Sequence, residues 1–380
     1  MKLLFFKWNS FLNEGIEQAL KNLEIDYTTF FYQFTDWEDD DDFLELFRSA
    51  LSTSGADQVL SVNYSPLIAK ICNEFDKKYV AYIYDSPIHI RRREELFFST
   101  THLFCFDRGQ AIKYRNEGIK AWHQPLAASP KLFLREVPSA AQRRKYASEI
   151  SFVGQLYETD YRHYCGPLDA YRRGFLEGVI KAQGKVYGAY FLPELITDDL
   201  LEGMNECYLR ASNGKVTISR PELEYMLACE VTSRERYIAL ALLSNHFQVK
   251  HYAAKKDERL SKVEYMGYAD YRKEMPKIFQ LSRINLNITL KTIQTGIPLR
   301  ALDVMACGGF LISNYQEELA EYFRLGEEVV TYGDLEELVY LADHFLQDED
   351  ARRRIALAGQ QRVEEAFSYE EALKRIIYEA

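Results

Sequence analysis

The chain has 380 residues, which is long for one core and suits two domains of ordinary size. Hydrophobic residues make up 47% of the chain and charged residues 27%, a balance typical of a globular protein. A formal net charge of -10 argues against a general binder of phosphate backbones, so nucleic acid is not an expected partner.

Neither a signal peptide nor a membrane segment is expected. The opening run MKLLFFKWNSF is short and is interrupted by Lys7 and Asn9. No stretch approaches the roughly 18 uncharged apolar residues of a membrane helix. The six cysteines lie far apart and form no CxxC pair, so we expect reduced thiols, no zinc site and a cytoplasmic protein.

The first 130 residues alternate apolar, β-rich runs with helical patterns. The apolar positions Ile16, Ala19, Leu20 and Leu23 have helical spacing, and a second helix is expected to end at Gly55. The expected strands are the runs KLLFFKW (2–8), YTTFFYQF (27–34), QVLSVNY (58–64), KYVAYIYD (78–85), HLFCFD (102–107) and AWHQPLA (121–127). Strands that alternate with helices indicate a parallel sheet with right-handed crossovers.

A polar stretch, 135–149, separates this series from a second one and is interpreted as a linker or an interdomain helix. The second series begins at ISFVGQL (150–156), and a helical insertion is expected at about 166–235. The later expected strands are FQVKHYA (247–253), VEYMGY (263–268), INLNITL (284–290), GFLISN (309–314) and EEVVTY (327–332). Capping-box spacing at Asp334 and Ser368 predicts the starts of the last helices.

This order predicts an α/β protein of two doubly wound, Rossmann-like domains, one of them with a helical insertion. The expected boundaries are 1–140 for the first domain and 141–365 for the second, followed by a final helix in 366–380. The natural ligand site of such a protein is a cleft between the domains, at the carboxyl ends of the strands.

The segment TGIPLRALDVMACGGFLISN (295–314) carries the clearest chemical signal. Pro298 suits the first turn of a helix, and Gly296 allows the backbone to turn tightly or to approach a ligand. Arg300 lies at a helix start, where acids are favoured, so an anion bound there would explain it. A carboxylate one turn on, Asp303, could accept hydrogen bonds from ribose hydroxyls. The alternative is a local ion pair between Arg300 and Asp303 on an exposed face.

The run GIPLRALDVMACGGFLISNYQEEL resembles the donor-site segment of group 1 glycosyltransferases of the GT-B fold, and most closely the CgeB-like, spore-maturation branch. Further runs resemble other parts of that branch or superfamily, and together they cover nearly the full chain. They are YIYDSP (82–87), CFDRG (105–109), HQPLAASP (123–130), ISFVGQLY (150–157) and the helical tail 332–363.

The resemblance implies a glycosyltransferase, in all expectation a hexosyltransferase, with an acceptor-side domain in 1–140 and a nucleotide-sugar-binding domain in 141–365. The helix in 366–380 would cross back to the first domain. The donor would be a nucleotide-diphosphate sugar, with a UDP-sugar favoured, and the acceptor a hydroxyl of a protein or surface glycoconjugate. Neither a cofactor nor a metal is implied. Many group 1 enzymes have two glutamates with seven residues between them, and here these positions are Thr295 and Asp303, so the anomeric outcome stays open.

Carried onto this sequence, the resemblance and the strand ends give a set of donor-binding candidates. For four of them, Gly154, Gln155, Asn287 and Lys291, a turn or surface role remains the alternative. Lys291 would add positive charge beside the diphosphate, and backbone near Tyr252, Ala253 and Gly267 would frame the base. The full set is Gly154, Gln155, Tyr252, Ala253, Gly267, Asn287, Lys291, Gly296, Ile297, Pro298, Leu299, Arg300 and Asp303.

The catalytic candidates lie in the first domain. Asp85 follows an apolar strand and could act as general base on an acceptor hydroxyl, or it could stabilise a turn. His89 is a weaker candidate base. Asn9, Ser10 and Asn63 are the acceptor-side candidates.

The acidic run DWEDDDD (36–42) could bind a metal, but its place before a helix favours solvated, dipole-stabilising acids. The same fold could also serve a nucleotide-sugar epimerase or a non-catalytic nucleotide-sugar-binding scaffold. A homodimer is compatible with the sequence.

Overall fold

The structure is a computed structural model, and it describes residues 1–133 and 137–379. The first two residues of the expected linker, 135 and 136, lie outside the described residues. The chain's contacts divide it into two compact units. Unit 1 consists of Met1–Arg135, Thr295–Ala306 and Gln360–Ala380, and unit 2 of Glu136–Gln294 and Cys307–Gly359. This division describes contacts within the folded chain and not independently folding domains. The domain boundaries at 140 and 365 therefore stay predictions.

Unit 1 is built on a six-stranded parallel sheet of order β2-β1-β3-β4-β5-β6. Its strands are β1 (Lys2–Lys7), β2 (Asp26–Phe31), β3 (Gln58–Val62), β4 (Lys78–Ile83), β5 (Thr101–Cys105) and β6 (Ala121–His123). Its helices are α1 (Asn13–Asn22), α2 (Asp41–Ser54), α3 (Pro66–Glu74), η1 (Glu94–Phe97), α4 (Arg108–Asn116), α5 (Pro130–Phe133), α13 (Leu299–Ala306) and α17 (Tyr369–Tyr378).

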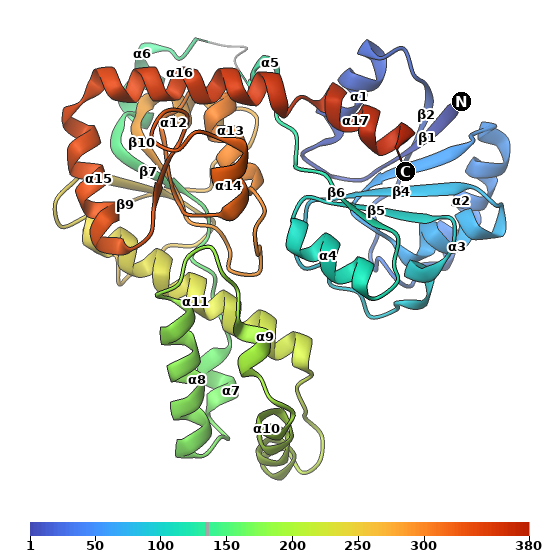
Figure 1. The fold of residues 1–380 in the computed structure, drawn as a ribbon, viewed down its shortest axis with the longest axis horizontal. Coiled ribbons are helices and arrows are strands. Elements are labelled where there is room, and N and C mark those ends of the chain that lie inside the picture. The colour runs from blue at the N-terminus through green and yellow to red at the C-terminus, as the bar shows by residue number, and fades with distance from the viewer. Residues whose placement is uncertain (134–136, 380) are drawn as a thin grey trace. The chain divides into compact units, whose positions relative to one another are not determined.

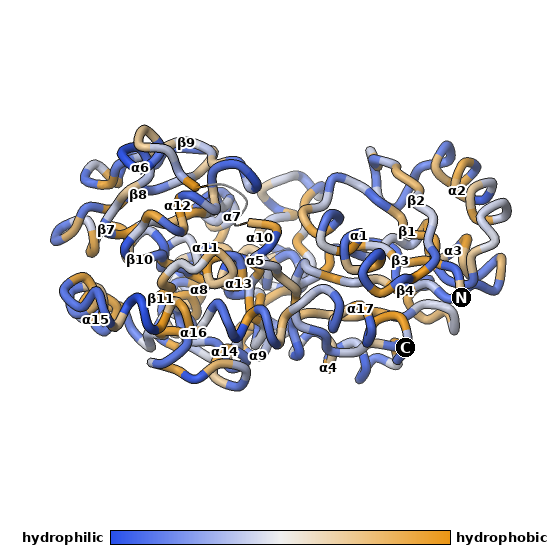
Figure 2. Tube along the Cα trace, turned by 90° about the horizontal axis from the view of Figure 1, so that it is seen from above, coloured by the Kyte–Doolittle hydropathy of each residue, from blue (hydrophilic) through white to orange (hydrophobic). Residues whose placement is uncertain are grey.

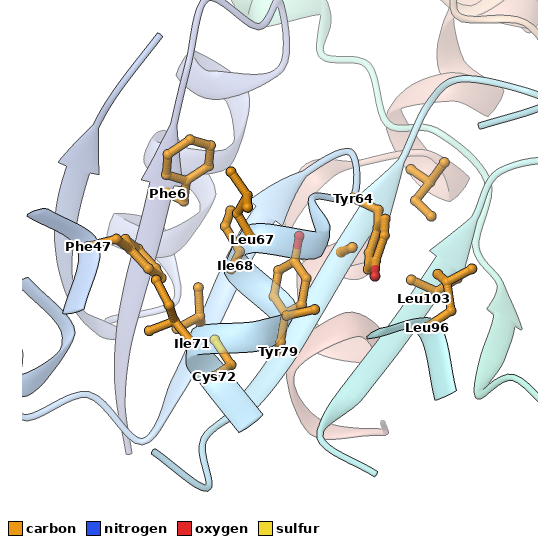
Figure 3. Close-up of a cluster of buried hydrophobic side chains, with 14 of the residues drawn as sticks. Phe6, Phe47, Tyr64, Leu67, Ile68, Ile71, Cys72, Tyr79, Leu96 and Leu103 are labelled. Carbon is orange, nitrogen blue, oxygen red and sulfur yellow. The ribbon is translucent and has the colours of Figure 1, made fainter. Parts of the chain in front are cut away.

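The core of unit 1 explains why β3 and β4 have apolar runs instead of an alternating pattern. Both strands are buried along nearly their whole length, because helices cover both faces of a parallel sheet. Figure 3 shows part of this core, where side chains of α3 such as Ile68 and Ile71 pack beside Tyr79 of β4. The rings of Phe6, Phe43 and Phe47 extend the same cluster.

The C-terminal helix α17 packs on α1 and β4. Gly15 of α1 makes this packing possible, since a Cβ at that position would lie 2.3 Å from the ring of Tyr369. Asn22 also donates a hydrogen bond to Glu370, with the atoms 2.6 Å apart. The predicted caps are confirmed: Asp334 accepts from the Glu337 amide, and Ser368 accepts from the Glu371 amide.

Unit 2 has a second six-stranded parallel sheet, of order β12-β11-β10-β7-β8-β9. Its strands are β7 (Ser148–Val153), β8 (Val249–Tyr252), β9 (Glu264–Gly267), β10 (Ser282–Asn287), β11 (Leu311–Asn314) and β12 (Val330–Tyr332). The helices beside it are α6 (Ala140–Tyr146), α12 (Met275–Leu281), α14 (Glu317–Tyr322), α15 (Leu335–Gln347) and α16 (Glu349–Ala366). Two parallel sheets with flanking helices confirm the predicted fold class.

The helical insertion is present and has a hydrophobic core of its own. It consists of α7 (Tyr161–Cys165), α8 (Ala170–Gln183), α9 (Leu192–Leu195) and α10 (Asp198–Ala211), together with the first half of α11. The whole of α11 spans Arg220–Leu243. Figure 1 shows α11 running from the sheet of unit 2 into this group of helices. The insertion was expected to end at about residue 235, but α11 continues without a break to Leu243.

Helices such as α15 show the amphipathic pattern expected when one face covers a core. Apolar and polar residues alternate along the surface helices in Figure 2. Among the described residues, no helix combines the length and apolar character required to cross a bilayer.

Candidate functional site

In doubly wound sheets, ligands bind at the carboxyl ends of the strands, where the strand order reverses direction. In unit 2 this switch point lies between β7 and β10, since β8 and β9 extend to one side and β11 and β12 to the other. The candidates Gly154 and Gln155 directly follow β7, and Asn287 is the last residue of β10. The structure therefore brings these three to the expected edge of the sheet.

Backbone hydrogen bonds connect the donor candidates on the β8–β9 side of the switch point. The Gly154 amide donates to Tyr252 O over 3.1 Å, and the Ala253 amide donates to Gly267 O over 3.0 Å. Gly267 has a φ of 80°, which glycine adopts without strain. The Tyr252 hydroxyl is buried and has no hydrogen-bond partner within the described residues, and burial raises its pKa. These four candidates form one continuous edge.

Arg236 of α11 braces the switch point, and the sequence interpretation missed it. Its guanidinium donates to Gln155 O after β7 and to Ile288 O after β10, the latter from Nε over 3.1 Å. It also lies 4.9 Å from the ring centroid of Tyr157, and burial lowers its pKa. A signal was available, because Arg236 stands one helical turn from the buried Leu240, on the apolar face of α11.

Lys291 is held by protein groups in this structure. Its ammonium lies 3.0 Å from Glu235 Oε2 and 4.2 Å from the ring centroid of Tyr187. The side chains of Lys291 and Glu235 are 8% and 2% exposed, so they form a buried ion pair. Lys291 also lines a small depression together with Gly188 and Tyr190 of the insertion, Asn314 at the end of β11 and Gln316 beyond it. A diphosphate bound by Lys291 would therefore share the positive charge of the ammonium with the Glu235 carboxylate.

The buried amide of Asn287 is used within the protein. It donates to Thr289 Oγ1 over 3.1 Å and to Ser313 Oγ over 2.9 Å. Asn314 in turn accepts from the Thr289 amide over 2.7 Å. This network ties the carboxyl ends of β10 and β11 together, so Asn287 has a clear structural role there.

The motif around Arg300 belongs to unit 1. Its helix, α13, begins at Leu299, one residue after the expected Pro298, and Ile297 and Pro298 are buried in front of it. Arg300 and Asp303 form the ion pair named above as the alternative, with Nη1 and Oδ2 3.4 Å apart. Their side chains are 27% and 2% exposed, so the carboxylate is buried and the pair differs from a solvated surface contact.

Asp107 anchors the chain that enters this helix. The carboxylate is fully buried and accepts from the Thr295 amide and hydroxyl, both over 3.1 Å, and from Ser86 Oγ over 2.8 Å. A Cβ at Gly296 would lie 2.9 Å from the Asp107 Cα. The close approach expected at Gly296 is therefore made to protein backbone, and Thr295 serves as a structural contact.

Asp85 and Asn63 meet at the carboxyl ends of β3 and β4. Asn63 Nδ2 donates to Asp85 Oδ2 over 2.7 Å, and Asn63 Oδ1 accepts from the Tyr84 amide over 3.0 Å. Asn63 has a φ of 61°, a left-handed backbone that is strained for most residues, as is common at functional sites. Burial raises the pKa of Asp85, whereas the hydrogen bond from Asn63 and the nearby His89 lower it.

Asn9 and Ser10 follow β1, the strand beside β3. The Asn9 amide donates to Gln33 Oε1 over 3.2 Å, and Ser10 Oγ accepts from the Leu12 amide over 3.2 Å. The ring of Trp8 lies 6.3 Å from that of Tyr84, nearly parallel to it. The carboxyl edge of the sheet of unit 1, whose switch point lies between β1 and β3, thus carries an aromatic pair, and one of its members, Tyr84, directly precedes Asp85.

Asn63→Gly is expected to move the acid limb of the pH–rate profile to higher pH. Glycine keeps the left-handed backbone and removes the amide that stabilises the charged carboxylate, so the pKa of Asp85 rises further. If Asp85 is the general base expected from the sequence, it must be deprotonated, and activity then begins to rise at a higher pH. The measurement is kcat/KM against pH. Glu24→Gly, at another left-handed residue, is the control for backbone relaxation. An acid limb that moves equally in both variants would contradict the role of Asn63.

The acidic run 36–42 is engaged by protein groups. Asp40 caps α2 through the Phe43 amide, and Asp36 forms an ion pair with Arg91 at 2.7 Å. Glu38 accepts from the amides of Arg91 and Arg92. Within residues 1–133 and 137–379, no three His, Cys, Asp or Glu side chains come together as potential metal ligands.

Residues 228–377 match the family model described as "Glycosyl transferase-like". None of the curated proteins matches the chain in sequence. Solved structures are similar over nearly the whole length. Sucrose-phosphate synthase from Thermosynechococcus elongatus is 11% identical, with a TM-score of 0.57 over 98% of this chain and 97% of that one. A glycosyltransferase from Rickettsia africae is 10% identical, with a TM-score of 0.53 over 100% and 99%. Anabaena HepE in complex with UDP-glucose is 9% identical, with a TM-score of 0.52 over 99% and 98%. At these identities the likeness shows the fold, which is the GT-B fold.

Proposed function

We propose that this chain, which carries a glycosyltransferase-family domain on a GT-B fold, transfers a sugar from a nucleotide-diphosphate sugar to a hydroxyl group. The observation that carries the proposal is the position of the family match. Residues 228–377 include Lys291, Gly296, Arg300 and Asp303, the residues that the sequence singled out for donor binding. The finer resemblance to the CgeB-like branch, and an acceptor on a protein or surface glycoconjugate, belong to the same proposal.

The proposal assigns the donor diphosphate to Arg300 and the start of α13. A guanidinium donates several hydrogen bonds in a planar fork that matches phosphate oxygens. The N–H groups at a helix start add partial positive charge. The side chain of Arg300 keeps 27% of its surface exposed, so a ligand can reach it. Leaving-group charge is thereby stabilised by fixed protein groups.

The remaining candidates divide between binding of the donor nucleoside and activation of the acceptor hydroxyl. Gly154, Tyr252, Ala253 and Gly267 would frame the nucleoside, because their backbone groups lie along one strand edge of unit 2. Asp85 would accept the proton of the acceptor hydroxyl, positioned by Asn63. A UDP-sugar is the favoured donor, and the HepE structure with UDP-glucose supports that preference.

A nucleotide screen tests the proposal. We expect UDP to raise the melting temperature of the protein more than GDP, TDP or CMP, since a ligand that binds only the folded state stabilises it. At a concentration 100 times its Kd the gain is about 2.7 kcal/mol. The measurement is thermal unfolding followed by fluorescence. An unchanged melting temperature with all four nucleotides at millimolar concentration would overturn the proposal.

A further inference from the structure

Helix α11 connects the two hydrophobic cores of unit 2. In its first half, Leu223 and Leu227 pack in the core of the insertion, whereas Leu240 and Leu243 in its second half pack under the sheet. The helix has 24 residues and no break. Between the two apolar halves lie Thr232, Glu235 and Arg236, which are 0%, 4% and 8% exposed. The spacing of these three residues puts them on one face of the helix.

All three side chains bind one segment, residues 288–291, which follows β10. Thr232 Oγ1 accepts from the Lys291 amide over 3.0 Å, while its own hydroxyl donates to Ala228 O over 2.8 Å. Glu235 pairs with the Lys291 ammonium at 3.0 Å. Arg236 donates to Ile288 O from two nitrogens. Four contacts from a single helix thus fix three groups of this segment, namely the Ile288 carbonyl and the amide and ammonium of Lys291.

The insertion also contacts this segment through a second element. Tyr187 lies against the Lys291 ammonium, and Gly188 and Tyr190 line the same depression as residues 289–294. Gly188 has a φ of 75°, and a Cβ there would lie 2.6 Å from the ring of Tyr315. The segment after β10 is therefore held between α11 and the loop 186–190.

Such an arrangement is costly if it only stabilises the fold. Burying an arginine, a glutamate and a lysine requires the loss of their hydration, and apolar side chains of similar volume usually stabilise a core as well or better. What the polar groups provide is a fixed backbone geometry, since each hydrogen bond specifies a direction as well as a distance. The segment that they fix runs directly into Thr295 and the Arg300 motif along the chain.

We propose that Thr232, Glu235 and Arg236 are positioning residues that hold the segment 288–294 in the geometry required for donor binding, with the insertion as their rigid support. The inference rests on the proposed function. According to this proposal, the insertion supports the donor site. Substitution of any of these three residues, which lie outside the predicted site, should therefore change the affinity for nucleotide.

Arg236→Lys tests this role with a conservative change. Lysine keeps the positive charge but cannot reach the carbonyls after both β7 and β10 at once. We expect the Kd for UDP to rise about ten- to a hundred-fold, because a small displacement of a binding loop has effects of this order. Thr232→Val, which keeps the shape of the side chain, removes the acceptor of the Lys291 amide and should raise the Kd in the same direction. Isothermal titration gives the Kd values.

Arg234→Lys is the matched control. Arg234 lies on the same helix and makes a two-pronged ion pair with Glu177 of the insertion, at 2.7 and 2.9 Å, without a hydrogen bond to the segment after β10. It should lower stability and leave the Kd for UDP within about two-fold of wild type. Hydrogen–deuterium exchange over residues 288–294 is the second readout, and it should accelerate in Arg236→Lys and Thr232→Val but not in Arg234→Lys.

The outcomes separate the two proposals. The positioning role is overturned if wild-type protein binds UDP and both Arg236→Lys and Thr232→Val have the wild-type Kd and the wild-type exchange rates over residues 288–294. The proposed function would then stand. A wild-type protein that binds no nucleotide removes the proposed function, and the role in donor binding is lost with it.

Discussion

Replacing Arg300 by alanine is expected to lower kcat/KM for transfer from a UDP-sugar by about 10²- to 10³-fold, the usual effect of removing one group that stabilises developing charge. In the proposed mechanism Arg300 neutralises the departing diphosphate together with the start of α13. The variant also removes a partner of the buried Asp303 carboxylate, 3.4 Å away, so thermal unfolding is measured beside the kinetics to separate a loss of stability from a loss of kcat/KM. Steady-state kinetics with a UDP-sugar, including its slow hydrolysis by water, measure the effect.

Two further variants locate the cause of this loss. Arg300→Lys keeps the charge but loses the planar fork, so we expect an intermediate kcat/KM. Arg353→Ala removes an arginine that pairs with Glu349 on the exposed surface of α16 and should have no effect. If Arg300→Ala and Arg353→Ala were equally active, Arg300 would have no part in the reaction.

Gly296→Ala is expected to destabilise unit 1 by about 1–3 kcal/mol, the usual cost of overpacking. The added Cβ would lie 2.9 Å from the Asp107 Cα, and a backbone atom cannot move aside as a flexible side chain can. Relief of this contact requires the chain to shift at Thr295, which is bound by the Asp107 carboxylate. Because that shift also moves the entry to α13, we expect the affinity for UDP to fall about ten-fold.

The control for Gly296→Ala is the same substitution at Gly174. This residue lies inside α8, and apart from its chain neighbours and the backbone of its own helix, no atom of the described residues stands within 4 Å of the position that its Cβ would take. Alanine there should stabilise the protein by about 0.5–1 kcal/mol through helix propensity. Chemical denaturation gives both values. A Gly296→Ala variant as stable as wild type would show that the contact with Asp107 is easily relieved.

The alternation of strands and helices was predictable, because a parallel sheet covered on both faces requires continuous apolar strands, as in β3 and β4. Helix starts were predictable wherever a capping side chain acts locally, as at Asp334 and Ser368. The first half of α11 was expected within the insertion, but the continuity of the helix was not. Its two halves face different cores, so no single apolar stripe runs along it.

The partners of the candidate site residues were not predictable from local patterns. Asp107 binds Thr295 across a separation of 188 residues, and no periodicity reports such a contact. The charge of Lys291 likewise suggested a phosphate partner. Its partner in the fold is Glu235, which lies far from it in the sequence. Arg236 was missed because an arginine in a helix usually lies on the surface, although its spacing from Leu240 places it on a buried face of α11.

The most direct test compares the affinities of UDP and UMP in wild-type protein and in Arg300→Ala, by isothermal titration. If Arg300 binds the diphosphate, wild-type protein prefers UDP over UMP, and the preference falls at least ten-fold in the variant while the affinity for UMP changes little. A variant that retains the full preference for UDP would contradict the claim that this side chain recognises the nucleotide diphosphate.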